Sequence, residues 1–412
     1  MNHETVLRHL VEAVNSPFNA ALRALIAQSA SGFQVAEATS RVETDLAQRL
    51  QGEPEFSPDT RRMIRVVAGA HSFGAEQAAR FLIAHTYAIG AEAAVEALQK
   101  VLVATAASAN FVLTLHGVRV ESCVGLDEDI SLVPFSALPD SQQKRWLLEG
   151  SGGFRSSLTE GSPHAALISP ITIRPFMYSL PGEENEGEAR SSLRVRDRVT
   201  DACLALVASS NQLTPIPGAQ WTQFEDPHLH QAAASGLLSN HDELRPFWAF
   251  IPGVIDAEAA SAVVRGFLKL EAPDKSRLSL AIQRLKNSRL RMMAHDKALE
   301  IGIAYEVMLS ALNEGQGEHA YKLSMRAARF CGGTHAEKLA IRGLVKALYG
   351  LRSSAAHTGK VEADIKLSGR GRVASTQVLR ESDALCTRIM RLVLERGSIP
   401  KWDEHDLDCG TG

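Results

Sequence analysis

Residues 334–360 read THAEKLAIRGLVKALYGLRSSAAHTGK and carry the signals of one complete helix. Thr334 and Glu337 are spaced as in a capping box, in which each side chain binds the backbone amide of the other residue. Apolar side chains recur every three or four positions behind this start, as they do on the buried side of a helix. Gly359 suits the left-handed position that follows a helix. The stretch predicts a helix of about 334–357, whose apolar stripe comprises Leu339, Leu344, Val345, Leu348 and Leu351.

Helical patterns surround this segment on both sides from about residue 256 onward. Aspartates stand in front of three of these patterns, and aspartate is a residue type that caps helix N-termini. A linker containing Gly369-Arg-Gly-Arg372 separates the long helix from the last one. Short connections between successive helices are typical of a helical bundle, which we predict over 256–408. The other expected helices are 257–270 after Asp256, 275–294 after Asp274, 297–313 after Asp296, 318–331 and about 376–396.

The N-terminal region, residues 1–107, also reads as helical. Apolar residues recur there at three-and-four spacing up to Ile26, and again in a block that begins at about Thr60. Gly74 and Gly90 are expected to break the second block, because glycine is a poor residue for a helix interior. We therefore expect several helices of ordinary length in this region.

The pattern changes to strands in residues 108–250. Asn110–Glu121, Ile130–Phe135 and Ala166–Ile173 are rich in β-branched and aromatic residues, and His116-Gly117 marks a turn within the first of them. The chain is therefore predicted to be mainly α, and α+β overall. A helical region and a small α+β module of unknown role would precede the C-terminal bundle.

The net charge of −3 conceals a strong asymmetry along the chain. Residues 1–260 contain 19 Lys and Arg against 30 Asp and Glu, whereas residues 261–400 contain 24 against 13. A basic C-terminal domain attached to an acidic N-terminal region favours contact between the basic part and a polyphosphate. The alternative is that the two parts neutralise each other across an interface.

Composition and cysteine usage are those of an ordinary soluble globular protein. Apolar residues make up 45% and charged residues 22% of the chain, and no apolar run approaches the ~18 residues that a membrane span requires. The five scattered cysteines include no Cys-x-x-Cys pair, which fits a reducing compartment and argues against a disulfide framework or a structural zinc site. We therefore expect a cytoplasmic protein that uses no membrane anchor and no cofactor.

Arg352 and His357, near the end of the long helix, have the chemistry needed to cleave RNA. An arginine holds a phosphate through its paired N–H donors, and a histidine exchanges a proton near neutral pH. RNA already contains its own nucleophile, the 2′-hydroxyl, so cleavage needs no metal-activated water. The alternative is a solvated helix end with a basic last turn, which an Arg and a His at this spacing also fit.

Five segments of the C-terminal half resemble, in order, those of the HEPN superfamily, and most closely its Apea-like branch. The most specific of them, Leu348–His357, is similar to the L-Y-x-L-R-S-x-x-x-H signature that carries the Arg-x4–6-His motif. Tyr305 departs from the family pattern, which has Leu at that position. The other four segments are Arg277–Leu285, Asp296–Glu306, Ser324–Phe330 and the closing Ile399–Asp408, so that the resemblance covers about 260–408.

The resemblance implies a metal-independent endoribonuclease whose products end in a 2′,3′-cyclic phosphate. Arg352 would hold the scissile phosphate, and His357 would act as general base or general acid. Proteins of this branch are usually placed among toxins and antiviral defence effectors, so RNA is the expected partner. The alternative is a non-catalytic HEPN module that binds RNA or dimerises in order to regulate a partner protein. A third possibility is that the N-terminal region senses an unidentified trigger.

Several residues near the motif are candidates for supporting roles. Glu306 and Arg326 occupy family positions, and each either forms an ion pair within the bundle or orients Arg352. Tyr349 belongs to the signature itself. Ser353 either bonds phosphate oxygens or fits a crowded contact between helices.

Basic residues continue beyond the motif. Lys360, Arg370 and Arg372 are distributed along the segment that follows the long helix. Their charges suit a path for the RNA backbone. A solvated basic loop is the common alternative for such a run.

The spacing of Arg352 and His357 predicts a homodimer. Five residues along a helix correspond to a rotation of ~500°, so the two side chains diverge by ~140° unless the helix ends between them. One chain would then not bring them into a compact site. The resemblance implies that two motif helices pair across a dimer, and we expect this dimer to form through the bundle.

A histidine-rich segment is the remaining candidate for a special site. His228, His230, His241 and Asp242 are residue types that bind metals. They have no further ligand at a suitable spacing, and loop histidines are the more common explanation. We therefore predict no metal site.

Overall fold

The computed structural model of the chain is mainly helical and contains several small sheets, which confirms the predicted mainly α, α+β class. The chain groups into two compact units. Unit 1 comprises Met1–Val112, Ser169–Asp197 and Gln220–Leu238, and unit 2 comprises Leu113–Ile168, Arg198–Ala219 and Ser239–Gly412. The structure describes residues 2–14, 32–57, 61–67, 69–149, 163–180, 186–211, 213–233, 238–239, 252–311 and 318–407.

Some predictions concern residues outside these described ranges. They include the helical pattern from residue 15 to Ile26, the metal candidates His241 and Asp242, and the last residue of the bundle, Asp408. The linear division into 1–107, 108–250 and 256–408 stays a prediction. No helix in the described ranges has both the length and the apolar content to cross a membrane.

Unit 1 contains the N-terminal helices and a three-stranded antiparallel sheet. Val6 and Leu10, which begin the predicted N-terminal pattern, are fully buried. Gly74 and Gly90 stand directly before two helices, as predicted. The elements are α1 (His3–Val14), α3 (Gly32–Leu50), α4 (Ala75–Ile89), α5 (Ala91–Val103) and α8 (Pro227–Ala232), with β1 (Arg61–Val66), β2 (Gly69–Ser72) and β8 (Met177–Leu180) in the strand order β2-β1-β8.

The helical prediction for the block after Thr60 is wrong where β1 and β2 form. Met63 of β1 pairs with Ser72 on one side and with Tyr178 of β8 on the other. The β8 partner lies far along the chain, and the backbone hydrogen bonds that it supplies are absent from any local pattern. Tertiary pairing therefore overrides the local preference, as it often does for strands.

A six-stranded sheet has the order β10-β9-β3-β7-β6-β5, and the division between the units falls within β3, β7 and β9. The three predicted strand segments are confirmed, including the turn at Gly117, which has a φ of 73°. The strands of this sheet are β3 (Ala107–His116), β5 (Val124–Gly125), β6 (Ser131–Pro134), β7 (Ala165–Ile173), β9 (Ile216–Phe224) and β10 (Leu238–Ser239). A separate parallel pair is formed by β4 (Val118–Arg119) and β11 (Gly253–Val254). The helices between these strands in the sequence include α6 (Gln142–Glu149) and α7 (Glu186–Ala205).

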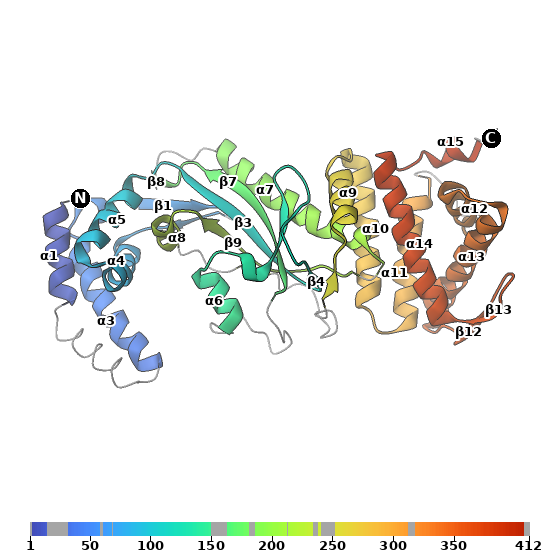
Figure 1. Cartoon of the computed structure of the whole chain (residues 1–412), viewed down its shortest axis with the longest axis horizontal. Helices are drawn as coiled ribbons and strands as arrows, with labels where there is room; N and C mark the ends of the chain where they lie inside the picture. The colour runs from blue at the N-terminus through green and yellow to red at the C-terminus, as the bar shows by residue number, and fades with distance from the viewer. Residues whose placement is uncertain are drawn as a thin grey trace. The chain divides into compact units, whose positions relative to one another are not determined.

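Unit 2 contains the predicted C-terminal bundle (Figure 1). Its helix α11 packs against α10, α13 and α14, so it lies at the centre of the bundle. Tyr305 of α11 is buried, and its hydroxyl donates a hydrogen bond to the Ser382 carbonyl at 2.9 Å. The helices are α9 (Ala257–Leu268), α10 (Ala272–Leu290), α11 (Ala294–Leu309), α12 (His319–Cys331), α13 (His335–Thr358), α14 (Ser375–Arg396) and α15 (Trp402–Leu407).

The helix caps confirm part of the prediction. Thr334 and Glu337 form the capping box at the start of α13, and Gly359 follows its end in the left-handed conformation with a φ of 66°. Asp256 caps α9 by accepting a hydrogen bond from the Ala259 amide at 2.9 Å. These signals are local, because the cap residue and the amide that it binds are at most three positions apart.

The predicted starts of α10 and α11 are wrong by three residues each. Helix α10 begins at Ala272 because Pro273 fits the first turn of a helix, where no N–H donor is needed. Asp274 therefore lies inside the first turn, and its Oδ2 accepts a hydrogen bond from the Ile399 amide at 3.2 Å. Asp296 likewise lies inside the first turn of α11, where its negative charge interacts favourably with the positive end of the helix dipole.

The predicted linker around residues 369–372 is a β-hairpin. Strands β12 (Asp364–Leu367) and β13 (Gly371–Ala374) pair antiparallel, with Lys366 opposite Arg372. Gly369 and Gly371 have φ values of 77° and 75°, which side-chain-bearing residues rarely adopt. The two glycines therefore build the turn of a hairpin and do not form a linker.

Two histidines in unit 1, His85 and His228, are expected to make the free energy of unfolding depend on pH. His85 of α4 is buried, its Nδ1 lies 3.0 Å from the Phe81 carbonyl, and its Nε2 lies 2.8 Å from Nδ1 of His228. Burial, and to a lesser extent the charge of His228, lowers the pKa of His85 below its ordinary value. The unfolded chain therefore takes up a proton at a higher pH than the folded chain does. The free energy of unfolding should fall as the pH drops below about 6.5.

Urea unfolding at pH 7.5 and at pH 5.5 checks this expectation, with His85→Gln as the control. Glutamine keeps a hydrogen-bonding group at this position but does not titrate, so its loss of stability between the two pH values should be smaller than that of the wild type. An equal loss in both proteins would contradict the assignment to His85.

Candidate functional site

The two predicted catalytic residues lie on one continuous helix. Helix α13 extends from His335 to Thr358, so it does not end between Arg352 and His357. The two side chains therefore diverge by ~140° and are separated by ~7.5 Å along the helix axis. The predicted divergence requires a helix that continues past both residues, and α13 does so. A single chain therefore does not bring Arg352 and His357 together in a compact site.

Arg352 is held on the side of α13 that packs against α11. Its Nη2 lies 3.2 Å from the carboxylate of Glu306, and the side chain is 29% exposed. The centre of the guanidinium group lies 5.8 Å from the centroid of the Tyr349 ring, which is the distance of a cation–π contact. The Nε atom of Arg352 is buried and has no hydrogen-bond partner among the described residues. Glu306 therefore forms an ion pair with Arg352, and this contact fits both alternatives predicted for Glu306.

A glycine in α11 provides the space for the Arg352 side chain. A Cβ atom added to Gly302 would lie 2.5 Å from Cγ and 3.1 Å from Cβ of Arg352. Any side chain at position 302 would displace the stem of the arginine, which is less mobile than its guanidinium end. The close crossing of α11 and α13 thus positions Arg352 by packing as well as by charge.

His357 lies in the last turn of α13 and is exposed. The cap that follows it is held by side chains: the Ser354 hydroxyl donates to the Lys360 carbonyl at 3.0 Å, and the Lys360 amide donates to the Thr358 hydroxyl at 3.3 Å. These bonds fix the helix end next to the imidazole. The imidazole itself stays accessible to a second molecule.

Small residues lie along one face of α13, whereas Leu339, which was predicted for the buried apolar stripe, is 49% exposed. The small residues follow each other at alternating steps of four and three, which places them along one face of a helix. Their side chains are exposed or half-buried, and a Cβ atom added to Gly350 would meet nothing within 4 Å. We call this face the small-residue face; it comprises Ala336, Ala340, Gly343, Ala347, Gly350 and Ser354, and the next step leads to His357.

Arg326 forms an ion pair within the bundle, which is one of the two alternatives predicted for it. It is 2% exposed, and its guanidinium donates to the Asp406 carboxylate at 2.7 and 2.9 Å and to the Leu309 carbonyl at 2.8 Å. It also lies over the Trp402 ring, at 5.9 Å from the centroid. Arg326 therefore anchors α15 to the bundle, and the ion pair within the bundle is the alternative that holds.

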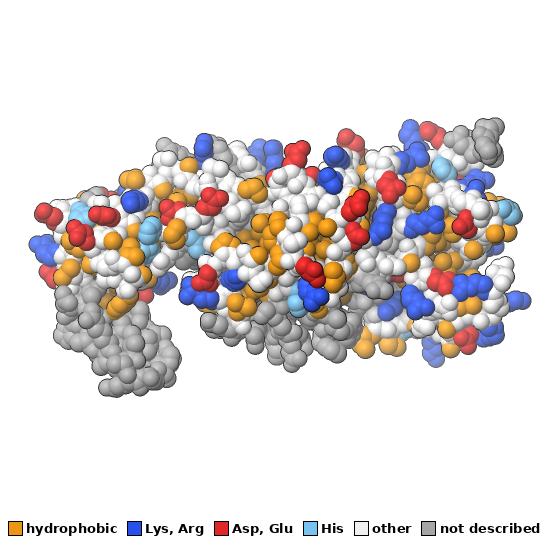
Figure 2. Space-filling view, viewed as in Figure 1, with side chains coloured by type: hydrophobic (Ala, Val, Ile, Leu, Met, Phe, Trp, Pro, Cys, Tyr) orange, Lys and Arg blue, Asp and Glu red, His pale blue; other side chains and the backbone are white. Residues whose placement is uncertain are grey.

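The predicted RNA-binding residues differ in how freely they present their charge. Lys360 is exposed, and Arg372 donates from its guanidinium to the Asp364 carbonyl at 3.2 Å. Arg370 is bound by the Glu381 carboxylate at 2.6 and 2.9 Å, and these hydrogen bonds raise the pKa of Arg370 above its ordinary value. Figure 2 shows Lys and Arg side chains interspersed with acidic ones over the part of unit 2 that includes β12 and β13.

Three further predicted residues, Ser353, His228 and His230, lie within the described ranges. Ser353 is half-buried on α13 and has no hydrogen-bond partner among the described residues. His228 binds His85, and Nδ1 of His230 accepts a hydrogen bond from the Phe224 amide at 3.3 Å. Within the part of the chain that the structure describes, no group of three His, Cys, Asp or Glu side chains is placed to hold a metal ion.

No protein-family model, no curated protein and no solved structure matches this chain. The likeness to the HEPN superfamily accordingly rests on the five sequence segments. A mainly α, α+β fold with several small sheets is the class that the structure shows.

Proposed function

We propose that this chain is a metal-independent endoribonuclease of HEPN type, which acts as a homodimer and serves as a toxin or an antiviral defence effector. The observation that carries the proposal is the state of the Arg/His pair on α13. Arg352 is oriented by Glu306 and by the space at Gly302, while His357 is exposed beside the small-residue face. Small side chains allow two helices to approach closely, so this face suits contact with a second copy of α13.

In the proposed reaction, His357 removes the proton from the RNA 2′-hydroxyl or donates one to the departing 5′-oxygen. The 2′-oxygen forms a bond to phosphorus as the bond from phosphorus to the 5′-oxygen breaks. Arg352 offsets the charge that builds on the non-bridging oxygens. The products end in a 2′,3′-cyclic phosphate and a 5′-hydroxyl, and every atom of the reaction comes from the RNA and the exchanged protons.

One observation favours the second candidate, a non-catalytic module that binds RNA or dimerises to regulate a partner protein. The guanidinium of Arg352 already has a carboxylate partner in Glu306. An arginine that only stabilised the crossing of α11 and α13 would have the same contacts. Sensing of an unidentified trigger by the N-terminal region stays a further proposal.

Incubation of the full chain with labelled RNA in excess EDTA tests the proposal. Cleavage should persist in EDTA, and Arg352→Ala and His357→Ala should each lower its rate by a factor of about 10²–10⁴, as expected for the loss of a general acid–base group or a charge-stabilising donor. His335→Ala is the matched control, because it removes an exposed histidine from the other end of the same helix.

The chemical ends of the RNA fragments test the proposed mechanism as well. Fragments should carry 2′,3′-cyclic phosphates. Cleavage that stops on chelation, or that survives both substitutions, would overturn the proposed mechanism. A wild-type chain that binds RNA and dimerises but does not cleave would favour the non-catalytic module.

A further inference from the structure

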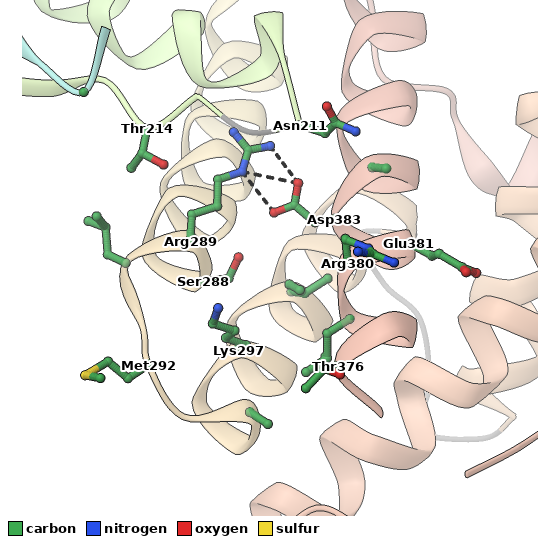
Figure 3. A pocket seen from close by; sticks show the side chains of 16 residues that line it. Asn211, Thr214, Ser288, Arg289, Met292, Lys297, Thr376, Arg380, Glu381 and Asp383 are labelled. Carbon is green, nitrogen blue, oxygen red and sulfur yellow. Dashed lines mark hydrogen bonds and ion pairs between the residues drawn. The ribbon is translucent and has the colours of Figure 1, made fainter. Parts of the chain in front are cut away.

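A cavity of about 660 Å³ lies in unit 2, where α10 ends and α11 and α14 begin (Figure 3). Its lining also includes Gly117 and the segment around Asn211 and Thr214. None of the residues assigned to RNA cleavage lines it. A volume of this order is typical of sites that bind small molecules.

One wall of the cavity is a buried ion pair whose hydrogen bonds are already used. Arg289 of α10 donates to the Asp383 carboxylate of α14 at 2.8, 3.0 and 3.3 Å, and the two side chains are 7% and 12% exposed. The same guanidinium donates to the carbonyls of Val207 and Leu213, at 2.9 and 2.6 Å, and to the Thr387 hydroxyl. Because these donors are occupied, the pair shapes the cavity but offers little to a ligand.

Two other cations of the lining have no such partner. No carboxylate of the described residues lies within 4.0 Å of Lys297 or Arg380. Glu381, which also lines the cavity, is bound by Arg370 at 2.6 Å and by Gln377 at 2.9 Å. In Figure 3 the Glu381 side chain points away from Lys297, which lies between the Arg289–Asp383 pair and Thr376 in this view. Lys297 and Arg380 therefore form no ion pair with the carboxylates of the lining, although the charge of Arg380 helps to lower the pKa of Glu381.

The rest of the lining combines polar and apolar groups. Asn211, Thr214 and Thr376 contribute an amide and two hydroxyls, whereas Ile301 and Leu379 contribute apolar surface. Thr376 also lies in the first turn of α14, where the helix dipole adds to the positive potential. Cations and donors beside an apolar wall match a molecule that has a phosphate at one end and an organic group at the other.

We infer that this cavity binds a phosphate-bearing small molecule of about mononucleotide size. Lys297 and Arg380 hold the phosphate, the nearby hydroxyls and amide donate to it, and the apolar residues cover the organic part. The site is separate from Arg352 and His357, and the inference does not depend on the proposed function.

Isothermal titration calorimetry of the full chain tests this site, with AMP, pyrophosphate and adenosine as the probes. AMP and pyrophosphate should each bind with one site per chain, and adenosine at least about tenfold more weakly than AMP, because it lacks the charge-assisted hydrogen bonds. Lys297→Ala and Arg380→Ala should each weaken AMP and pyrophosphate binding by at least about tenfold. Arg396→Ala is the matched control, because it removes an exposed arginine from the other end of α14.

Two further variants locate the bound AMP. Arg352→Ala and His357→Ala should leave AMP binding unchanged, and loss of binding in either would place AMP at the RNA site and overturn the inference. The inference is equally overturned if neither AMP nor pyrophosphate binds, if adenosine binds as tightly as AMP, or if Arg396→Ala weakens binding as much as the cavity variants do. Each of these results can be read from binding alone, whether or not the chain cleaves RNA.

Discussion

Co-expression of the Arg352→Ala and His357→Ala variants should restore RNA cleavage that neither variant has alone. In one chain the two side chains leave α13 in directions ~140° apart, so a compact site requires a second copy. A mixed dimer contains one intact Arg352 and one intact His357 in the shared cleft. Its cleavage rate should exceed that of either variant by at least about tenfold, since each variant alone lacks a group that contributes ~10²–10⁴.

The experiment uses two different affinity tags, so that only mixed dimers are purified and assayed. A chain with both substitutions, paired with either single variant, is the control and should restore nothing. Gly350→Arg tests the small-residue face directly: a Cβ atom at this position meets nothing within 4 Å in the single chain, but the arginine would keep a second α13 at a distance. This variant should be monomeric on gel filtration. Purified mixed dimers without activity, or an active monomer, would contradict the shared site.

Asp383→Ala should cause a large loss of stability. It removes the partner of Arg289 and leaves a buried guanidinium whose charge is not balanced. Removing one partner of a buried ion pair costs about 3–5 kcal/mol of unfolding free energy. Chemical denaturation followed by circular dichroism should therefore show a much lower midpoint than that of the wild type.

Two comparisons separate this effect from the loss of any charge. Lys401→Ala removes one side of an exposed pair, whose side chains are 80% and 72% exposed, and should leave the midpoint almost unchanged. Arg289→Met combined with Asp383→Leu should recover only part of the loss, because the carbonyls of Val207 and Leu213 would lose their donor. An Asp383→Ala midpoint close to that of Lys401→Ala would show that the pair contributes little.

The sequence predicts those elements of the bundle that are encoded by residues close together in the chain. The capping box of Thr334 and Glu337, the Asp256 cap and the glycine after α13 each need only a few neighbouring residues. Asp274 and Asp296 resemble caps equally well, yet both lie within a first turn. For Asp274, the preceding proline and the distant Ile399 amide decide the outcome, and the second of these cannot be read from local spacing.

Contacts between distant residues account for what the sequence does not predict. Strand β1 depends on its pairing with β8, and the role of Arg326 depends on Asp406. Arg289 and Asp383 are 94 positions apart, and no local pattern singles out either residue. The candidate site was only partly predictable for the same reason: α13 carries Arg352 and His357, but the contact with Glu306 depends on how α11 crosses it.

The absence of a side chain at Gly302 also links the residue types that positions 302 and 352 can have in related chains. The stem of Arg352 occupies the volume that a Cβ atom at position 302 would need. Substitution of this glycine by even the smallest side chain is therefore compatible with the present helix crossing only if residue 352 is shortened. In related chains we expect the two positions to vary together: glycine at 302 should accompany arginine at 352, and a larger residue at 302 should mark chains that have given up the arginine.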